Sequence, residues 1–122
     1  MNKKNIIWSK KTKDRDYSAA ASYLSLIYSP SFAKKLVERL RHAPLTLFYS
    51  KDVFRASELA LLGPRNSHVR KVRVKISRGH KISPILLVRN EPNGKVVIAD
   101  GYHRMCAVYS IDEDAILPCK II

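Results

Sequence analysis

Apolar residues recur at helical spacing in the first part of this 122-residue chain and at strand-like spacing later. Residues 16–28 and 29–44 place apolar side chains three or four positions apart, which predicts two helices. In the second helix, Ser29 is the expected N-cap and Pro30 the first residue. Its expected buried side consists of Phe32, Leu36, Val37 and Leu40. Residues 45–50 then read as a strand, and residues 51–62 as a third helix that Gly63-Pro64 closes.

Residues 69–77 fit two structures. Val72, Val74 and Ile76 alternate with cations, as on a half-buried strand, whereas Val69, Val72 and Ile76 also share one face of a helix. The spacing leaves both alternatives open.

The last third of the chain has a clearer pattern. Residues 84–88 and 95–99 are short apolar runs joined by "NEPNG", which is typical of a hairpin. A helix over 101–110, a polar loop at 112–114 and a strand over 115–122 follow, and Pro118 suits that strand to a sheet edge. We therefore predict an α+β fold: a small mixed sheet with flanking helices and an N-terminal helical extension. Residues 16–122 form one domain after a flexible basic arm at 1–15.

Composition narrows the class of protein. A hydrophobic content of 46% supports a packed core, and no apolar run reaches the length of a membrane span. Without an export signal, Cys106 and Cys119 are expected to be reduced thiols in the cytoplasm. Their spacing, like that of the histidines, does not match a metal site.

The net charge of +13 is concentrated in two segments. Residues 1–15 hold six Lys and Arg against one Asp, and residues 64–81 hold seven with no acid. Such segments attract nucleic acids, anionic surfaces or acidic partners, although a solvated face and a mobile tail would look the same. The candidate nucleic-acid contacts are Arg70, Arg73, Lys75 and Arg78.

The stretch "ADGYHR" joins the 95–99 strand to the helix that follows. We expect Asp100 to cap that helix and Gly101 to allow the sharp turn. The free N–H groups of the first helical turn attract anions, and Arg104 offers a planar fork for phosphate oxygens. His103 titrates near neutral pH and is suited to proton transfer. The simpler alternative is a capped helix with an exposed His and Arg.

The unit made of "PILLV", "KVVIADG" and "YHRMCAVY" resembles the ParB/sulfiredoxin superfamily over residues 81–122, with a looser extension to residues 51–57. The resemblance implies that Gly101, His103 and Arg104 hold nucleotide phosphates. A similar D-G-x-H-R turn in its free-serine kinase branch makes Asp100 and His103 the catalytic candidates, with Asp100 near Mg²⁺ or a hydroxyl. The superfamily also has a helix before the "PILLV" strand whose start faces the nucleotide. This favours the helix for 67–78 and adds four phosphate-binding candidates: Asn66, Ser67, His68 and Lys71.

Two departures limit the analogy. Tyr102 stands where sulfiredoxins carry a cysteine, so sulfinic-acid reduction is not expected, and the chain ends at Ile122 without the helix-turn-helix region of ParB proteins. We expect binding of ATP, another nucleotide or a phosphorylated small molecule, with Mg²⁺-dependent phosphoryl transfer or nucleotide hydrolysis as the reaction. The alternatives are a nucleic-acid-binding module, with ParB-like DNA binding or nuclease behaviour, and a catalytically inactive interaction domain.

Overall fold

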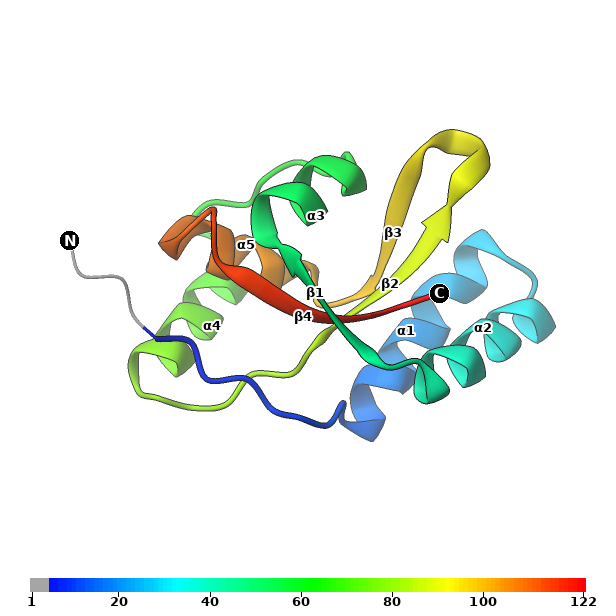
Figure 1. The fold of residues 1–122 in the computed structure, drawn as a ribbon, viewed down its shortest axis with the longest axis horizontal. Helices are drawn as coiled ribbons and strands as arrows, with labels where there is room; N and C mark the ends of the chain where they lie inside the picture. The colour runs from blue at the N-terminus through cyan, green and yellow to red at the C-terminus, as the bar shows by residue number, and fades with distance from the viewer. Residues whose placement is uncertain (1–4) are drawn as a thin grey trace.

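The order of helices and strands follows the sequence pattern closely, in a computed structural model that describes residues 5–122 (Figure 1). The elements are α1 (Asp14–Ile27), α2 (Pro30–His42), β1 (Leu45–Tyr49), α3 (Ser50–Ser57), α4 (Ser67–Ser77), β2 (Ile85–Asn90), the 3₁₀ turn η1 (Glu91–Asn93), β3 (Lys95–Asp100), α5 (Tyr102–Ile111) and β4 (Ile116–Ile121). The predicted α+β class, with helices flanking a mixed sheet, is confirmed.

The sheet has the strand order β1-β4-β2-β3. β1 pairs antiparallel with β4, β4 parallel with β2, and β2 antiparallel with β3. Helices α3, α4 and α5 pack on one face, whereas α1 and α2 pack on the other face over β2 and β3 (Figure 1). This two-sided cover explains why residues 85–88 of β2 and 96–99 of β3 are unbroken apolar runs. Ile85 and Leu87 enter the core under α4 and α5, and their neighbours Leu86 and Val88 enter the core under α1 and α2.

Residues 69–77 are helical, which settles the alternative that the spacing left open. Asn66 is the N-cap of α4, and its Oδ1 accepts hydrogen bonds from the amides of His68 (3.0 Å) and Val69 (3.1 Å). Val69 and Ile76 are buried on one side of the helix. The cap and the buried stripe together favour a helix over a strand.

Two predicted helix details are wrong. The third helix ends at Ser57 instead of residue 62, because Glu58 adopts a left-handed conformation with φ of 56°. In α2, Phe32 is exposed and Ala33 takes the buried position. The predicted cap at Ser29 and the first-turn Pro30 are confirmed.

The last strand lies inside the sheet, so its predicted edge position is wrong. The Ser50 amide donates to the Ala115 carbonyl (2.8 Å), and hydrogen-bonded pairs alternate along an antiparallel ladder. The Leu47–Pro118 pair is therefore one of the non-hydrogen-bonded pairs between β1 and β4. Pairing with β2 begins only at Cys119. Pro118, which has no N–H group, thus stands at a position where the pairing with β1 requires no hydrogen bond from it.

The segment before α1 is attached to the domain. The Ser9 amide donates to the Ile82 carbonyl (2.8 Å), the Ile82 amide donates to the Ile7 carbonyl (2.9 Å), and Trp8 packs against the core. Residues 7–9 of the predicted arm therefore have fixed contacts, and α1 begins at Asp14. Lys3 and Lys4 lie outside the described residues. Within residues 5–122, no helix combines the length and the apolar character that a bilayer crossing requires.

Candidate functional site

The turn between β3 and α5 depends on glycine. Gly101 is the N-cap of α5 with φ of 107°, a backbone conformation that other residues rarely adopt. A Cβ atom at this position would lie 2.7 Å from Ile85 Cδ1 and 3.0 Å from Arg104 Nη2. The chain therefore needs a glycine here both for its conformation and for the space.

Asp100 does not cap α5, which corrects the sequence prediction. No side chain caps the first turn of this helix. Instead, Arg104 Nη2 lies 2.9 Å from Asp100 Oδ2 and donates to the Pro84 carbonyl at 3.1 Å. The two charged side chains are 18% and 16% exposed. The ion pair therefore fastens the start of α5 to the end of β3 and to the residue before β2.

Burial governs the chemistry of this ion pair. It raises the pKa of the Asp100 carboxyl above its ordinary value, and the nearby Arg104 guanidinium opposes that rise only in part. The Arg104 Nε atom is buried without a hydrogen-bond partner. The Arg104 guanidinium is thus occupied by Asp100 and the Pro84 carbonyl in this structure. Its role as a phosphate ligand stays a prediction.

The first turns of α4 and α5 meet at two histidines. The rings of His68, in α4, and His103, in α5, have centroids 4.7 Å apart, and the Tyr102 ring lies 5.5 Å from His103. Burial lowers the pKa of His103 below its ordinary value, and His68 and Arg104 lower it further. His103 is therefore a neutral imidazole at pH 7, able to donate with one nitrogen and accept with the other.

Tyr102 is a structural residue of the site that the sequence analysis missed. Its hydroxyl donates to the Ala60 carbonyl and so ties the connection between α3 and α4 to the start of α5. Burial raises the pKa of Tyr102. The signal available in the sequence was its position directly after the turn glycine.

The predicted basic residues fall into two groups. Arg70, Lys71, Lys75 and Arg78 are exposed on or beside α4, as is the phosphate-binding candidate Ser67. Arg73 instead turns toward α5 and donates to Ser110 Oγ at 2.6 Å. The prediction for Arg73 as a nucleic-acid contact is therefore weakened, because its guanidinium serves helix packing.

The residues near the turn do not offer a cation site. Among residues 5–122, no group of three or more His, Cys, Asp or Glu side chains is placed to hold a metal ion. Asp100 is engaged by Arg104, and the buried Asp16 accepts from the Lys13 amide at 3.3 Å. Cys106 is buried on α5, and burial raises the pKa of its thiol. Asp100 is therefore not free to coordinate an ion in this conformation, and Mg²⁺ binding stays a prediction.

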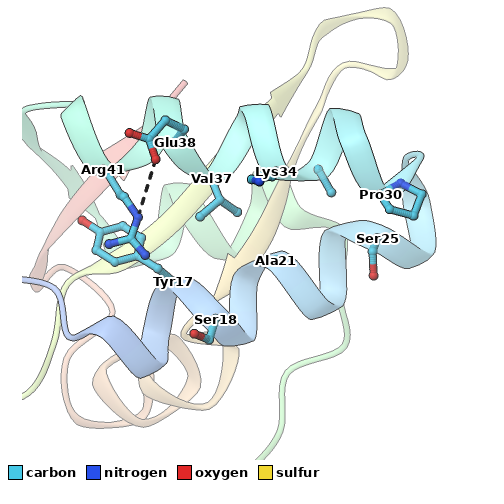
Figure 2. A pocket seen from close by; sticks show the side chains of 10 residues that line it. Tyr17, Ser18, Ala21, Ser25, Pro30, Lys34, Val37, Glu38 and Arg41 are labelled. Carbon is cyan, nitrogen blue, oxygen red and sulfur yellow. Dashed lines mark ion pairs between the residues drawn. The ribbon is translucent and has the colours of Figure 1, made fainter.

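A groove of about 390 Å³ between α1 and α2 offers less chemistry (Figure 2). Its charged side chains include Glu38 and Arg41, whose Oε2 and Nε atoms lie 3.8 Å apart, and Arg41 also covers the Tyr17 ring at 4.4 Å. The residues that line it include neither His nor Cys. The turn at the start of α5 is therefore the better candidate.

Comparison of the chain with protein-family models, with curated proteins and with solved structures finds no match. The resemblance to the ParB/sulfiredoxin superfamily stays an expectation, and the assignment of the site depends on its geometry.

Proposed function

We propose that this domain binds the phosphate of a nucleotide, such as ATP, or of another phosphorylated small molecule where the first turns of α4 and α5 meet. The observation that carries the proposal is the 4.7 Å contact between His68 and His103, because each ring stands in the first turn of its own helix. The positive ends of two helix dipoles thus converge on one place. An anion there gains from both helices.

The two helices contribute differently. The amides of His68 and Val69 in α4 are already satisfied by Asn66, whereas no side chain caps α5. The N–H groups after Gly101 are therefore the proposed donors to phosphate oxygens. Neutral His103 adds a further donor, and a bound phosphate would favour its protonated form. Ser67, His68 and Lys71 complete the α4 side of the site, and Asn66 acts through its cap.

Turnover is the second part of the proposal. His103 is the group for proton transfer, since its lowered pKa leaves a free acceptor nitrogen at neutral pH. Asp100 is the other candidate, although its pairing with Arg104 must break before it can act. Because Asp100, the candidate carboxylate for Mg²⁺, is paired with Arg104, the proposal includes no step through a metal.

Calorimetric titration with ATP, ADP, CTP and GTP, each with and without Mg²⁺, tests binding. We expect saturable binding that His103→Ala weakens about tenfold or more, the loss of one or two charge-assisted hydrogen bonds. His80→Ala, in an exposed loop, is the matched control and should bind as the wild type does. Arg104→Ala is a poorer probe, because it also leaves Asp100 buried without its partner. Equal binding by wild type and His103→Ala would refute the proposed site.

A second candidate function is nucleic-acid binding by α4. The observation that favours it is the exposure of Arg70, Lys71 and Lys75 on that helix and of Arg78 at its C-cap. Binding should weaken steeply with salt, with a slope in the double-logarithmic plot of about −0.9 for each phosphate contacted on duplex DNA. Replacing Lys75 and Arg78 together with Ala should reduce the slope, and an unchanged slope would exclude this face.

A further inference from the structure

The edge strand β1 lacks the features that normally protect a sheet edge. Its sequence, Leu45-Thr46-Leu47-Phe48-Tyr49, contains no charge, proline or glycine, and its register with β4 runs without a bulge. Sheet edges in soluble proteins are commonly blocked by such residues, because an open edge can pair with another strand. β1 is therefore an edge that is chemically ready for pairing.

The ladder with β4 shows which backbone groups of β1 are free to pair. Ser50 is hydrogen-bonded opposite Ala115, so the alternation along the strand directs Phe48 and Thr46 toward β4. The N–H and C=O groups of Leu45, Leu47 and Tyr49 consequently point away from β4. Three donors and two acceptors are free at the open edge, because the Tyr49 carbonyl, at the N-cap of α3, already accepts the first hydrogen bond of that helix.

The same three residues carry an uncovered apolar surface. Leu45 is 41%, Leu47 63% and Tyr49 50% exposed, and Ile116 on β4, opposite Tyr49, is 46% exposed. These side chains lie on the face of the sheet where α1 and α2 pack. Those two helices cover β2 and β3, however, and leave β1 uncovered on that face (Figure 1).

Opposite charges lie at the two ends of β1. Before the strand, the last turn of α2 supplies Arg39, Arg41 and His42. After it, Asp52 and the 112–114 loop supply four carboxylates, and the loop is held there by the bond from the Lys51 amide to the Glu113 carbonyl (3.0 Å). Lys51 pairs with Asp114 (2.7 Å) and Arg55 with Asp52 (3.7 Å), so four carboxylates and two cations leave this end with a formal charge of −2 in a strongly basic protein.

We propose that β1 pairs antiparallel with β1 of a second copy of this chain, about a twofold axis at Leu47, to form a continuous eight-stranded sheet. This register places Leu47 opposite its own counterpart and Leu45 opposite Tyr49. The free outward groups are then paired, and the Leu45 N–H shares the Tyr49 carbonyl that α3 already uses. The register also sets the basic end of each strand beside the acidic end of the other. That arrangement offsets the repulsion expected between two chains of net charge +13.

The mass of the wild type in solution tests the proposal. Light scattering behind size exclusion, with loading up to about 100 µM, should give twice 13.9 kDa, with monomer on dilution. Leu47→Pro removes only an outward N–H and should yield a monomer. Leu47→Lys places a charge on the edge and should raise the dissociation constant of the dimer at least about tenfold. This variant replaces Leu47→Pro as the test if the proline variant does not fold. Leu26→Lys, on exposed α1, is the matched control and should remain dimeric.

Amide hydrogen exchange identifies the surface. In the concentrated wild type the amides of Leu45, Leu47 and Tyr49 should be protected, and in Leu47→Lys those of Leu45 and Tyr49 should exchange freely. A wild type that is monomeric at every loading concentration up to about 100 µM overturns the proposal. That result would also be expected if the edge bound a strand of a different protein. A dimer in which these amides exchange freely, or that both Leu47 variants leave intact, overturns the proposal as well.

Discussion

Replacement of Gly101 by alanine should destabilise the fold through two separable effects. The left-handed backbone costs about 1–2 kcal/mol for a residue with a Cβ. The Cβ would also lie 2.7 Å from Ile85 Cδ1 inside the core, and such overpacking costs about 1–3 kcal/mol. Alanine returns roughly 0.4–1 kcal/mol by restricting the unfolded chain. The expected net loss in the free energy of unfolding is about 2–4 kcal/mol.

Three other glycine and isoleucine variants isolate each effect. Gly63→Ala has an ordinary φ and open space, so it should be neutral or slightly stabilising. Gly79→Ala has φ of 74° and open space, so it should show the backbone effect alone, about 1 kcal/mol. Ile85→Val removes the Cδ1 atom that the new Cβ would meet. It should cost about 0.5–1.5 kcal/mol in the wild type but less, or nothing, in Gly101→Ala.

Urea unfolding followed by circular dichroism measures all of these differences. With a slope of about 2 kcal/mol per molar urea, the middle of the usual range, the Gly101→Ala midpoint should fall by about 1–2 M. If Gly101→Ala were no less stable than Gly79→Ala, the close approach of β2 to the turn would be refuted. If Ile85→Val cost the same in both backgrounds, Ile85 would not be the contact responsible.

Three further predictions concern the side chains around the site. The pKa of His103 is lower in the folded protein than its ordinary value near 6.5, so the folded state loses stability as the pH falls from 6.5 through the folded pKa. His103→Gln removes this titration and should flatten that part of a stability–pH profile measured by urea unfolding. Arg73→Ala loses a charged hydrogen bond between α4 and α5 and should cost about 1–2 kcal/mol in the same assay, whereas Arg70→Ala, on the exposed side, should change stability by less than about 0.5 kcal/mol. Tyr102→Phe frees the α3–α4 connection from α5, so limited trypsin digestion should cleave faster at Arg65 than in the wild type; an unchanged rate would contradict the tie.

The spacing of apolar residues predicted most elements because it reports which side of each element is buried. It could not decide residues 69–77, where the apolar positions satisfy both periods; the capping residue Asn66 was the decisive local signal. The same spacing predicted too long a third helix, because Leu59 and Leu61 continue the helical pattern although they are partly exposed in a loop after α3. Strand order was inaccessible because the place of β4 between β1 and β2 depends on pairing between distant segments.

At the site, the sequence located the turn but not the use of its charges. Asp100 ends β3 and Arg104 lies in the first turn of α5, so their ion pair depends on the turn at Gly101 and not on helical spacing. The contact between His68 and His103 joins elements 35 positions apart and emerges only from the packing of α4 on α5. The resemblance to the ParB/sulfiredoxin superfamily stays an expectation, and the closeness of these two helix starts is a finding of the structure alone.

The two proposed surfaces lie toward opposite edges of the sheet and should act independently. The phosphate site follows β3, and β1 is the other edge strand, so three strand spacings of about 4.8 Å, roughly 14 Å, separate the edges. Effects at sites more than about 10 Å apart usually add within a few tenths of a kcal/mol. A monomeric Leu47→Lys variant should therefore bind nucleotide with the wild-type dissociation constant in calorimetry, and His103→Ala should remain dimeric. A change in affinity of more than about threefold in Leu47→Lys would show that dimerisation and ligand binding are coupled.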